Sequence, residues 1–239
     1  MKSRKKAKYQ KWKCTGDAVE KPDEEKPTDG GNTGGGSEVV PPADGRPRIL
    51  ALHGGGGNGA GFSQDGGIRA LMNAVGDNFE FVFASAPQNG LWMRDPPSKD
   101  EPTNDPAWAD VALNYLDDFI AQNGPFYAML GYSQGSAFIP VYLSNRPEAQ
   151  NQFNRVMMYC GYTPTTHLGL METLNANSPL STPAMVFSGA QDPFAFGAPD
   201  QVAVFDNVVH YESEEAGHHL PFSNDEQFQN TVDFILAGL

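Results

Sequence analysis

The sequence is short of cysteine, of positive charge and of long apolar runs. Its 239 residues contain only two cysteines, Cys14 and Cys160. Two thiols cannot form a disulfide framework, so we expect a reducing compartment and a cytoplasmic location. No run of about 18 consecutive apolar residues occurs, so the sequence predicts no transmembrane helix.

Positive charge is especially scarce after the first 46 residues. Residues 1–46 hold ten basic and eight acidic side chains, whereas residues 47–239 hold six basic and twenty-one acidic ones. A domain this acidic repels nucleic acid and anionic membranes at long range, so neither is an expected partner. A neutral or cationic small molecule fits the charge better.

The first 46 residues have the composition of a tail. Met1–Lys13 carries seven basic residues and no apolar segment, which argues against a secretory signal and leaves a nuclear address or a basic anchor open. Asp17–Arg46 is rich in Gly, Pro, Asp and Glu, as linkers are. We therefore predict a disordered tail over 1–46 and one globular domain over 47–239.

Short apolar runs alternate with helical patterns along the predicted domain. Strands are expected at Arg48–Leu52, Phe79–Ala84, Pro125–Leu130, Arg155–Cys160, Pro183–Ser188 and Asn207–Tyr211. Helices are expected over Ile68–Val75, over Asp110–Asn123, from Gln134 onward and through Thr231–Leu239. Strands that alternate with helices indicate a doubly wound α/β fold with a mostly parallel sheet of about six strands.

The chemistry centres on Gly131-Tyr132-Ser133-Gln134-Gly135, between an apolar strand and the start of a helix. This is the Gly-x-Ser-x-Gly pattern of a nucleophile elbow, a sharp strand-to-helix turn. Nearly bare residues two before and two after the serine prevent collisions across the turn. We therefore expect Ser133 to be a nucleophile and the backbone N–H of Gln134 to form half of an oxyanion hole.

A serine hydroxyl needs a base to take its proton, and the base needs an acid to orient it. On this architecture the order along the chain is Ser, then Asp or Glu, then His. Asp192 follows a predicted strand by a short turn, and His218 follows the last one, so both should share the carboxyl edge of the sheet with Ser133. The alternatives are Asp200, Asp206, His167, His210 and His219.

The glycine-rich turn after the first strand has two interpretations. Gly54, Gly56 and Gly59 fit Gly-x-Gly-x-x-Gly, the dinucleotide fingerprint of an oxidoreductase. That fingerprint also requires an acid at the end of the next strand, where Ala84-Ser85-Ala86 stands. We favour an oxyanion-hole loop whose second donor is the N–H of Gly55, with Gly54 and Gly56 as alternatives.

A Pro-rich excursion over Gln88–Trp108 leaves the sheet at the same edge. Leu91, Trp92 and Met93 are apolar residues within this otherwise polar segment. Because pockets on this architecture lie above the carboxyl ends of the strands, we predict that these three residues wall the substrate pocket. The alternative is that they pin the excursion to the core.

Together these motifs resemble the FSH serine hydrolase family of small α/β-hydrolases. The elbow is similar to that family's Gly-Phe-Ser-Gln-Gly, and Gly189–Asp192 is similar to its Gly-x-x-Asp turn. His53–Gly59 resembles its His-Gly-x-x-Gln-Asn-Gly turn, with Gly57 in place of Gln. Gly217–Pro221 is similar to its Gly-His-x-x-Pro, which selects His218 over its neighbour.

The resemblance implies an α/β-hydrolase fold and a serine hydrolase of the carboxylesterase or thioesterase type, without a cofactor or a metal. Ser133 would attack the acyl carbon, His218 would transfer the proton, and Asp192 would orient His218. The substrate is then a small-molecule ester or thioester, whose acyl and leaving groups the sequence does not specify, nor does it specify the oligomeric state. The alternative from another class is a non-catalytic binding protein of the same fold.

Overall fold

A computed structural model of the protein describes residues 45–94, 102–105, 107–237 and 239. The predicted tail over 1–46 lies almost wholly outside the described residues, so its extent stays a prediction. Among the described residues, no helix has both the length and the apolar character that a membrane span requires.

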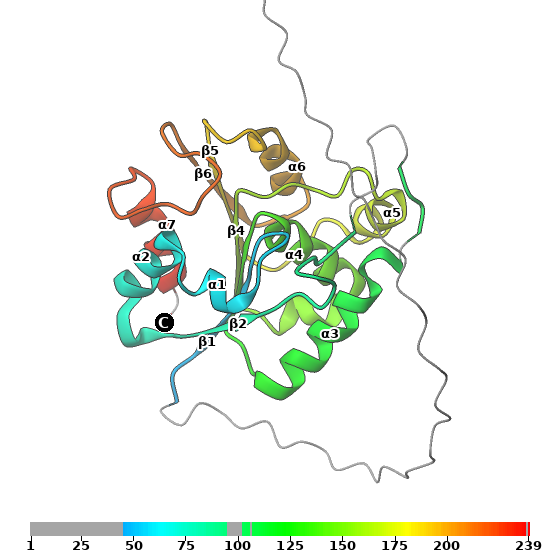
Figure 1. Cartoon of the computed structure of the whole chain (residues 1–239), viewed down its shortest axis with the longest axis horizontal. Coiled ribbons are helices and arrows are strands. Elements are labelled where there is room, and N and C mark those ends of the chain that lie inside the picture. The colour runs from blue at the N-terminus through cyan, green and yellow to red at the C-terminus, as the bar shows by residue number, and fades with distance from the viewer. Residues whose placement is uncertain (1–44, 95–101, 106, 238) are drawn as a thin grey trace, which may run out of the picture. The chain divides into compact units, whose positions relative to one another are not determined.

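Six strands form a parallel sheet at the centre of the domain (Figure 1). Their order across the sheet is β2-β1-β3-β4-β5-β6, and each neighbouring pair is parallel. The strands are β1 (Arg48–Leu52), β2 (Glu80–Ala84), β3 (Ala128–Tyr132), β4 (Arg155–Tyr159), β5 (Ala184–Gly189) and β6 (Val208–Ser213). This sheet confirms the predicted α/β class, and each predicted strand matches an observed one to within a few residues at either end.

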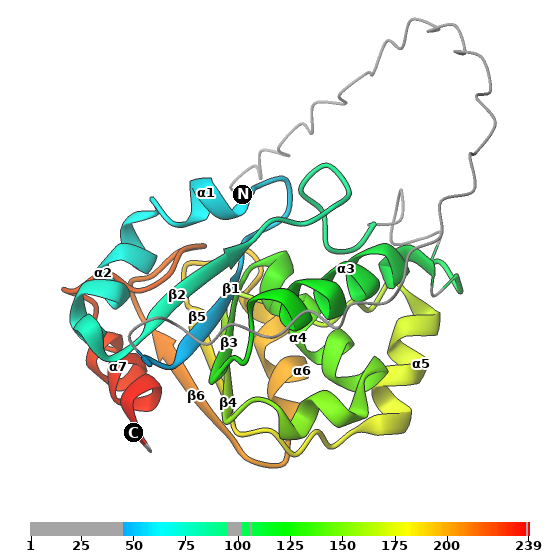
Figure 2. The same ribbon diagram turned by 90° about the horizontal axis from the view of Figure 1, so that it is seen from below.

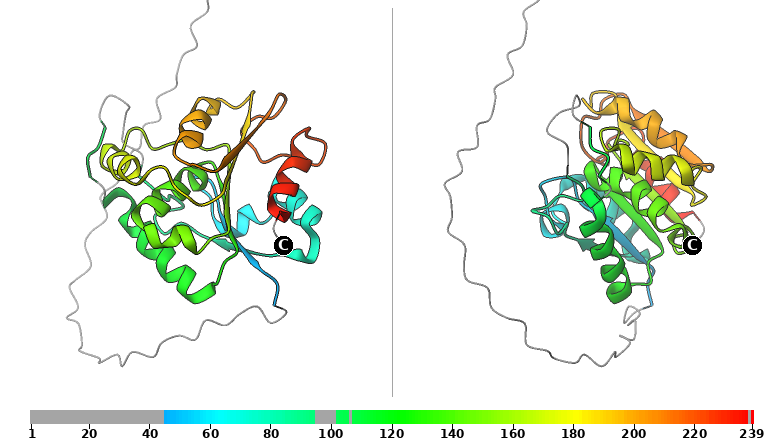
Figure 3. Two further views of the ribbon diagram at one scale, coloured as in Figure 1. Left: turned by 180° about the vertical axis from the view of Figure 1, so that it is seen from behind. Right: turned by 90° about the vertical axis from the view of Figure 1, so that its right-hand side faces the viewer.

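Helices cover both faces of this sheet (Figures 2 and 3). They are α1 (Gly59–Phe62), α2 (Gly66–Val75), α3 (Ala107–Asn123), α4 (Gln134–Asn145), α5 (Leu168–Asn177), α6 (Ala198–Ala203) and α7 (Phe228–Leu236). Short 3-10 turns add η1 (Gly76–Asn78), η2 (Pro147–Asn151) and η3 (Ala195–Gly197). Helices α3 to α6 pack on one face, and α1, α2 and α7 pack on the other.

The alternation of side chains along each strand divides the apolar residues between two cores. In β1, Leu50 belongs to the core under α3 to α6, whereas Ile49 and Ala51 belong to the core under α1, α2 and α7. Successive residues of a strand point to opposite faces, so a strand buried on both faces needs apolar residues throughout. This explains the continuous apolar runs in the sequence.

Three helices, α1, α5 and α6, have no counterpart among the sequence expectations, and α1 is only four residues long. Helix α5 buries only Leu170 and Leu174, and α6 is six residues long. A helix with so few buried positions carries little apolar periodicity, which is the signal that sequence reasoning depends on. The predicted helix over Asp110–Asn123 is present as part of α3.

The strand order has a topological switch point between β1 and β3. From β1 the chain crosses to β2 on one side, whereas β3 to β6 extend to the other side. The connections that follow β1 and β3 therefore lead to opposite faces and separate above the carboxyl ends of these strands. In an open parallel sheet, ligands bind at such a point.

Candidate active site

Ser133 occupies the turn between β3 and α4. Its backbone, with φ 51° and ψ −117°, lies in a region that L residues rarely adopt. A Cβ at Gly131 would lie 2.6 Å from the backbone of Gly135, which is the collision across the turn that the sequence predicts. A Cβ at Gly135 would lie 2.4 Å from the Leu52 carbonyl oxygen, so this glycine also allows α4 to approach β1.

Two hydrogen bonds connect Ser133, His218 and Asp192. His218 Nε2 lies 2.9 Å from Ser133 Oγ, and His218 Nδ1 lies 2.8 Å from Asp192 Oδ2. The Asp192 side chain is 1% exposed, and its other oxygen accepts the Phe194 N–H at 2.7 Å. The His218 side chain is 25% exposed. Such an arrangement can remove the proton of a serine hydroxyl and return it to a leaving group.

The alternative acids lie apart from this triad. Asp206 precedes β6, which places it at the amino edge of the sheet, opposite to Ser133. Asp200 lies in α6 and lines the cavity beside Ser133, but it makes no contact with His218 among the hydrogen bonds of the described residues.

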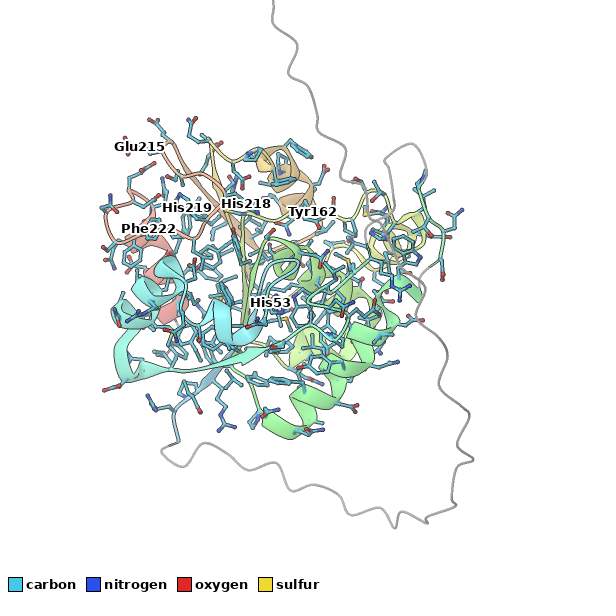
Figure 4. The ribbon with its side chains drawn as sticks, in the orientation of Figure 1. His53, Tyr162, Glu215, His218, His219 and Phe222 are labelled. Atoms are coloured by element: carbon cyan, nitrogen blue, oxygen red, sulfur yellow. The ribbon has the colours of Figure 1, made fainter. Side chains whose placement is uncertain are left out.

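The alternative histidines also point elsewhere. His219 uses both ring nitrogens within its own loop, and Figure 4 shows it on the side of His218 away from the labelled Tyr162. His210 lies in β6 and its Nε2 is 2.8 Å from a serine hydroxyl of β5. His167 is buried just before α5. The geometry thus brings only His218 to Ser133.

The two expected oxyanion donors lie together. Among the residues that the structure describes, neither the Gln134 N–H nor the Gly55 N–H donates to a protein acceptor. A Cβ at Gly55 would lie 3.4 Å from the Gln134 side chain, and both residues line the cavity beside Ser133. Of the alternatives, Gly56 donates its N–H to Gly90 at 2.8 Å, and Gly54 packs on the elbow without lining the cavity.

His53 holds this glycine-rich loop from beneath. The residue is 1% exposed, its Nε2 accepts the Ala86 N–H at 2.9 Å, and its Nδ1 lies 2.7 Å from the Gly54 carbonyl oxygen. Because Nε2 accepts, Nδ1 carries the proton and donates to that carbonyl. Burial lowers the pKa of His53, so the ring stays neutral and keeps both bonds.

Trp92 and Met93 are fully buried, and neither lines the cavity. The Trp92 indole Nε1–H donates to the His53 carbonyl at 2.8 Å, and the Trp92 N–H donates to Gln134 Oε1 at 2.8 Å. Gln134 Nε2 in turn donates to the Met93 carbonyl at 3.1 Å. These bonds correct the expected pocket wall: Leu91 lines the cavity, but Trp92 and Met93 pin the excursion to the oxyanion loop and α4.

A cavity of about 750 Å³ opens beside Ser133. Apart from the elbow and the glycine loop, its lining combines aromatic and aliphatic side chains with three threonines, and Asp200 is the one acidic or basic side chain that the described lining contains. The lining residues are Leu91, Tyr162, Thr163, Pro164, Thr165, Thr166, Phe194, Phe196, Gly197 and Asp200, with Gly55, Gly56, Ser133 and Gln134. This shape suits a bulky apolar group rather than an anion.

Sequence reasoning missed most of this wall. The segment Tyr162–Thr166 follows β4, and Phe194 and Phe196 follow Asp192. The available signal was position: residues just beyond the carboxyl end of a parallel strand lie at the edge where ligands bind.

Cys160 lies directly behind the triad. Its sulfur, Asp192 and His218 offer atoms within 4.8 Å of one another, a spacing that metal ligands can have. Desolvation, reinforced by the Asp192 charge, raises the pKa of the Cys160 thiol, so the sulfur keeps its proton. A metal ligand would be a thiolate. Both ring nitrogens of His218 are already engaged by Asp192 and Ser133, so the trio fits a hydrogen-bonded triad with a thiol beside it better than a metal centre.

Comparison with known proteins relates this chain to serine hydrolases and esterases. The model of a family described as "Serine hydrolase (FSH1)" matches residues 43–230. Esterase FUS5 of Gibberella fujikuroi is 27% identical over 207 residues, covering 75% of this chain and 82% of the relative. Esterase FUS5 of Gibberella moniliformis is 28% identical over 210 residues, with the same coverage.

Solved structures share the fold at lower identity. The crystal structure of esterase PE8 matches with a TM-score of 0.58 and 18% identity, covering 82% of this chain and 95% of that one. The Bacillus cereus carboxylesterase matches with a TM-score of 0.55 and 17% identity, covering 79% and 87%. These neighbours show that the fold is that of the α/β-hydrolases.

Proposed function

Because the chain belongs to the FSH1 serine hydrolase family, we propose that Ser133, His218 and Asp192 carry its ester-cleaving activity. The family match confirms the resemblance read from the sequence motifs, and the esterase relatives support a serine hydrolase of the carboxylesterase type. The observation that carries the residue assignment is the pair of hydrogen bonds, 2.9 Å and 2.8 Å long, that joins the three side chains.

The proposed reaction proceeds through an acyl-enzyme. Ser133 Oγ attacks the acyl carbon while His218 Nε2 takes its proton, and Asp192 stabilises the imidazolium that forms. The negative charge that develops on the carbonyl oxygen accepts hydrogen bonds from the N–H groups of Gln134 and Gly55. His218 then gives the proton to the departing alkoxide, which leaves as an alcohol. Water, deprotonated by the same base, releases the acid and restores the Ser133 hydroxyl.

Removing the nucleophile tests this assignment. Ser133→Ala should abolish ester hydrolysis and labelling by a fluorophosphonate probe, while the thermal unfolding curve stays close to that of the wild type. Ser63→Ala, at the end of α1, is the matched control and should label normally. Normal labelling of a folded Ser133→Ala protein would contradict the assignment. A wild-type protein that neither labels nor hydrolyses esters would favour the non-catalytic alternative.

The cavity suggests the kind of acyl group. A lining that is mostly apolar, with Asp200 as its ionisable member, favours an uncharged bulky acyl chain and disfavours one that ends in a carboxylate. A chain-length series of p-nitrophenyl esters and the corresponding thioesters would define the preference, including whether thioesters are cleaved.

A matched pair of substrates tests the charge selection. The p-nitrophenyl ester of pentanoic acid and the mono-p-nitrophenyl ester of glutaric acid have acyl chains of equal length, and only the second ends in a carboxylate. We expect the charged ester to have the lower kcat/KM. In Asp200→Asn, the ratio of kcat/KM for the uncharged ester to kcat/KM for the charged ester should fall by about 2- to 5-fold, as expected for an exposed pair of charges. An unchanged ratio in Asp200→Asn would remove Asp200 from substrate selection.

We also propose that the protein is cytoplasmic and has no nucleic-acid partner. This rests on the two cysteines and on the acidity of residues 47–239. Microscopy of the full chain carrying a fluorescent tag would test the location.

A further inference from the structure

The loop that carries His218 receives hydrogen bonds from the segments that carry its two partners. The Gln191 N–H, next to Asp192, donates to the Ala216 carbonyl at 3.0 Å. The Tyr132 hydroxyl, next to Ser133, donates to the carbonyl of His218 itself at 2.7 Å. The base is thus linked through its own backbone to the neighbours of the nucleophile and of the acid.

A third donor comes from the end of β4. The Cys160 thiol lies 3.2 Å from the His219 carbonyl oxygen and 3.7 Å from that of Gly217. Cys160 has a φ of 52°, an unusual conformation for a residue with a side chain, and it is 2% exposed. The left-handed backbone turns this residue out of the strand direction at the point where the loop passes.

Both side-chain donors keep their protons at neutral pH. Burial raises the pKa of Tyr132 to about 12, and desolvation raises that of Cys160. A protonated phenol and a protonated thiol can donate to the loop carbonyls, and the Asp192 carboxylate is a second acceptor within reach of the thiol. The Tyr132 ring also packs against the rings of His218 and Phe62, with centroid distances of 5.3 Å and 5.9 Å. This packing holds the hydroxyl in place.

We propose that Tyr132 and Cys160 are positioning residues. Their hydroxyl and thiol groups hold the backbone of the His218 loop so that the His218 ring stays within hydrogen-bond distance of both Ser133 and Asp192. This inference rests on the proposed function. Because Tyr132 directly precedes Ser133, the hydrogen bond from its hydroxyl to the His218 carbonyl links the backbone of the nucleophile to the backbone of the base. A small displacement of Ser133 or His218 is therefore expected to be followed by the other residue. Neither residue takes part in proton transfer. Their effect is on the alignment of a contact whose geometry governs the rate.

The main test removes only the Tyr132 hydroxyl. Tyr132→Phe keeps the ring and its packing, and we expect kcat and the rate of fluorophosphonate labelling to fall by about 5- to 10-fold, the effect of one neutral hydrogen bond. KM should change less than about twofold, since Tyr132 does not line the cavity. The matched control is Tyr127→Phe, which removes a tyrosine hydroxyl that donates to the Ala237 carbonyl at 3.2 Å, away from the triad.

A second pair of variants tests the thiol. Cys160→Ala removes the donor and should lower kcat without raising KM, whereas Cys160→Ser retains a hydroxyl that can reach the His219 carbonyl and should recover part of the rate. Equal rates in the two variants would show that donation by residue 160 does not matter. If either variant fails to fold, the tyrosine pair decides alone.

Two results would overturn the inference. One is a kcat for Tyr132→Phe that equals that of Tyr127→Phe. The other is a melting temperature lowered well beyond that of the control, with kcat per folded molecule unchanged, which would make the bond purely structural. The proposed function is judged separately, because Ser133→Ala tests it whatever the tyrosine variants do.

Discussion

Replacing Trp92 by alanine would show whether the excursion after β2 shapes the pocket or holds the oxyanion loop. Trp92 is fully buried, and its indole N–H donates to the His53 carbonyl. Truncating a buried aromatic side chain costs about 3–5 kcal/mol of unfolding free energy. For a domain of this size, that corresponds to a melting temperature lower by about 6–20 °C. The acyl preference should not change, because Trp92 does not line the cavity.

The assay compares two adjacent residues. Thermal unfolding and kcat/KM for a series of p-nitrophenyl esters would be measured for Trp92→Ala and for Leu91→Ala. Leu91 lines the cavity and is only partly buried, so its truncation should cost little stability and shift the preference toward longer acyl chains. If Trp92→Ala does not fold, Trp92→Phe offers a milder change. It leaves the His53 carbonyl without its donor, at a cost of about 1–3 kcal/mol.

The expected roles of Trp92 and Leu91 would be refuted if each variant showed the result expected for the other. If Trp92→Ala kept its melting temperature and changed the chain-length profile, the side chain would reach the substrate in solution. If Leu91→Ala lost stability and kept the wild-type profile, the cavity beside Ser133 would not be the acyl site. A loss of kcat in Trp92→Ala with an unchanged profile is the expected outcome, since the oxyanion loop would lose one of its supports.

Three further predictions concern the tail, the elbow and the buried histidine. A shortened chain that begins at Pro47 should keep its hydrolytic rate and its melting temperature, because the tail lacks the composition to build a core; an insoluble or inactive product would contradict the boundary. Gly135→Ala should destabilise the fold by about 1–3 kcal/mol in thermal unfolding, because its Cβ would meet backbone of β1 at 2.4 Å. Gly61→Ala, with 3.4 Å to its neighbour, is the control. The pKa of His53 is lower in the folded protein than its ordinary value of 6.5, so stability should hold above pH 6.5 and decline as the pH falls through the folded pKa, less so in His53→Gln. Equal pH dependence in the two proteins would show that His53 is not responsible.

The sequence by itself determined the fold class and the three proposed catalytic residues. Apolar runs that alternate with helical patterns specify a parallel sheet covered on both faces, because burial on both sides demands continuous apolar strands. The elbow glycines mark Ser133, since only a nearly bare residue fits on either side of that turn. Chain order then places Asp192 and His218 among a few candidates at the carboxyl edge of the sheet, and the resemblance to the family's Gly-His-x-x-Pro turn selects His218 over His219. These patterns depend on the residue types and their order along the chain, so they can be recognised without the tertiary structure.

The tertiary structure alone decided what surrounds those residues. Nothing in the local sequence distinguishes Leu91, which lines the cavity, from Trp92, which is buried beside it. The same holds for the bonds from Tyr132 and Cys160 to the loop of His218, which join residues 57 or more positions apart. Sequence periodicity states which face of an element is apolar, but not which distant segment covers it. That choice follows from how the whole chain packs, because each contact depends on the positions of elements remote in sequence.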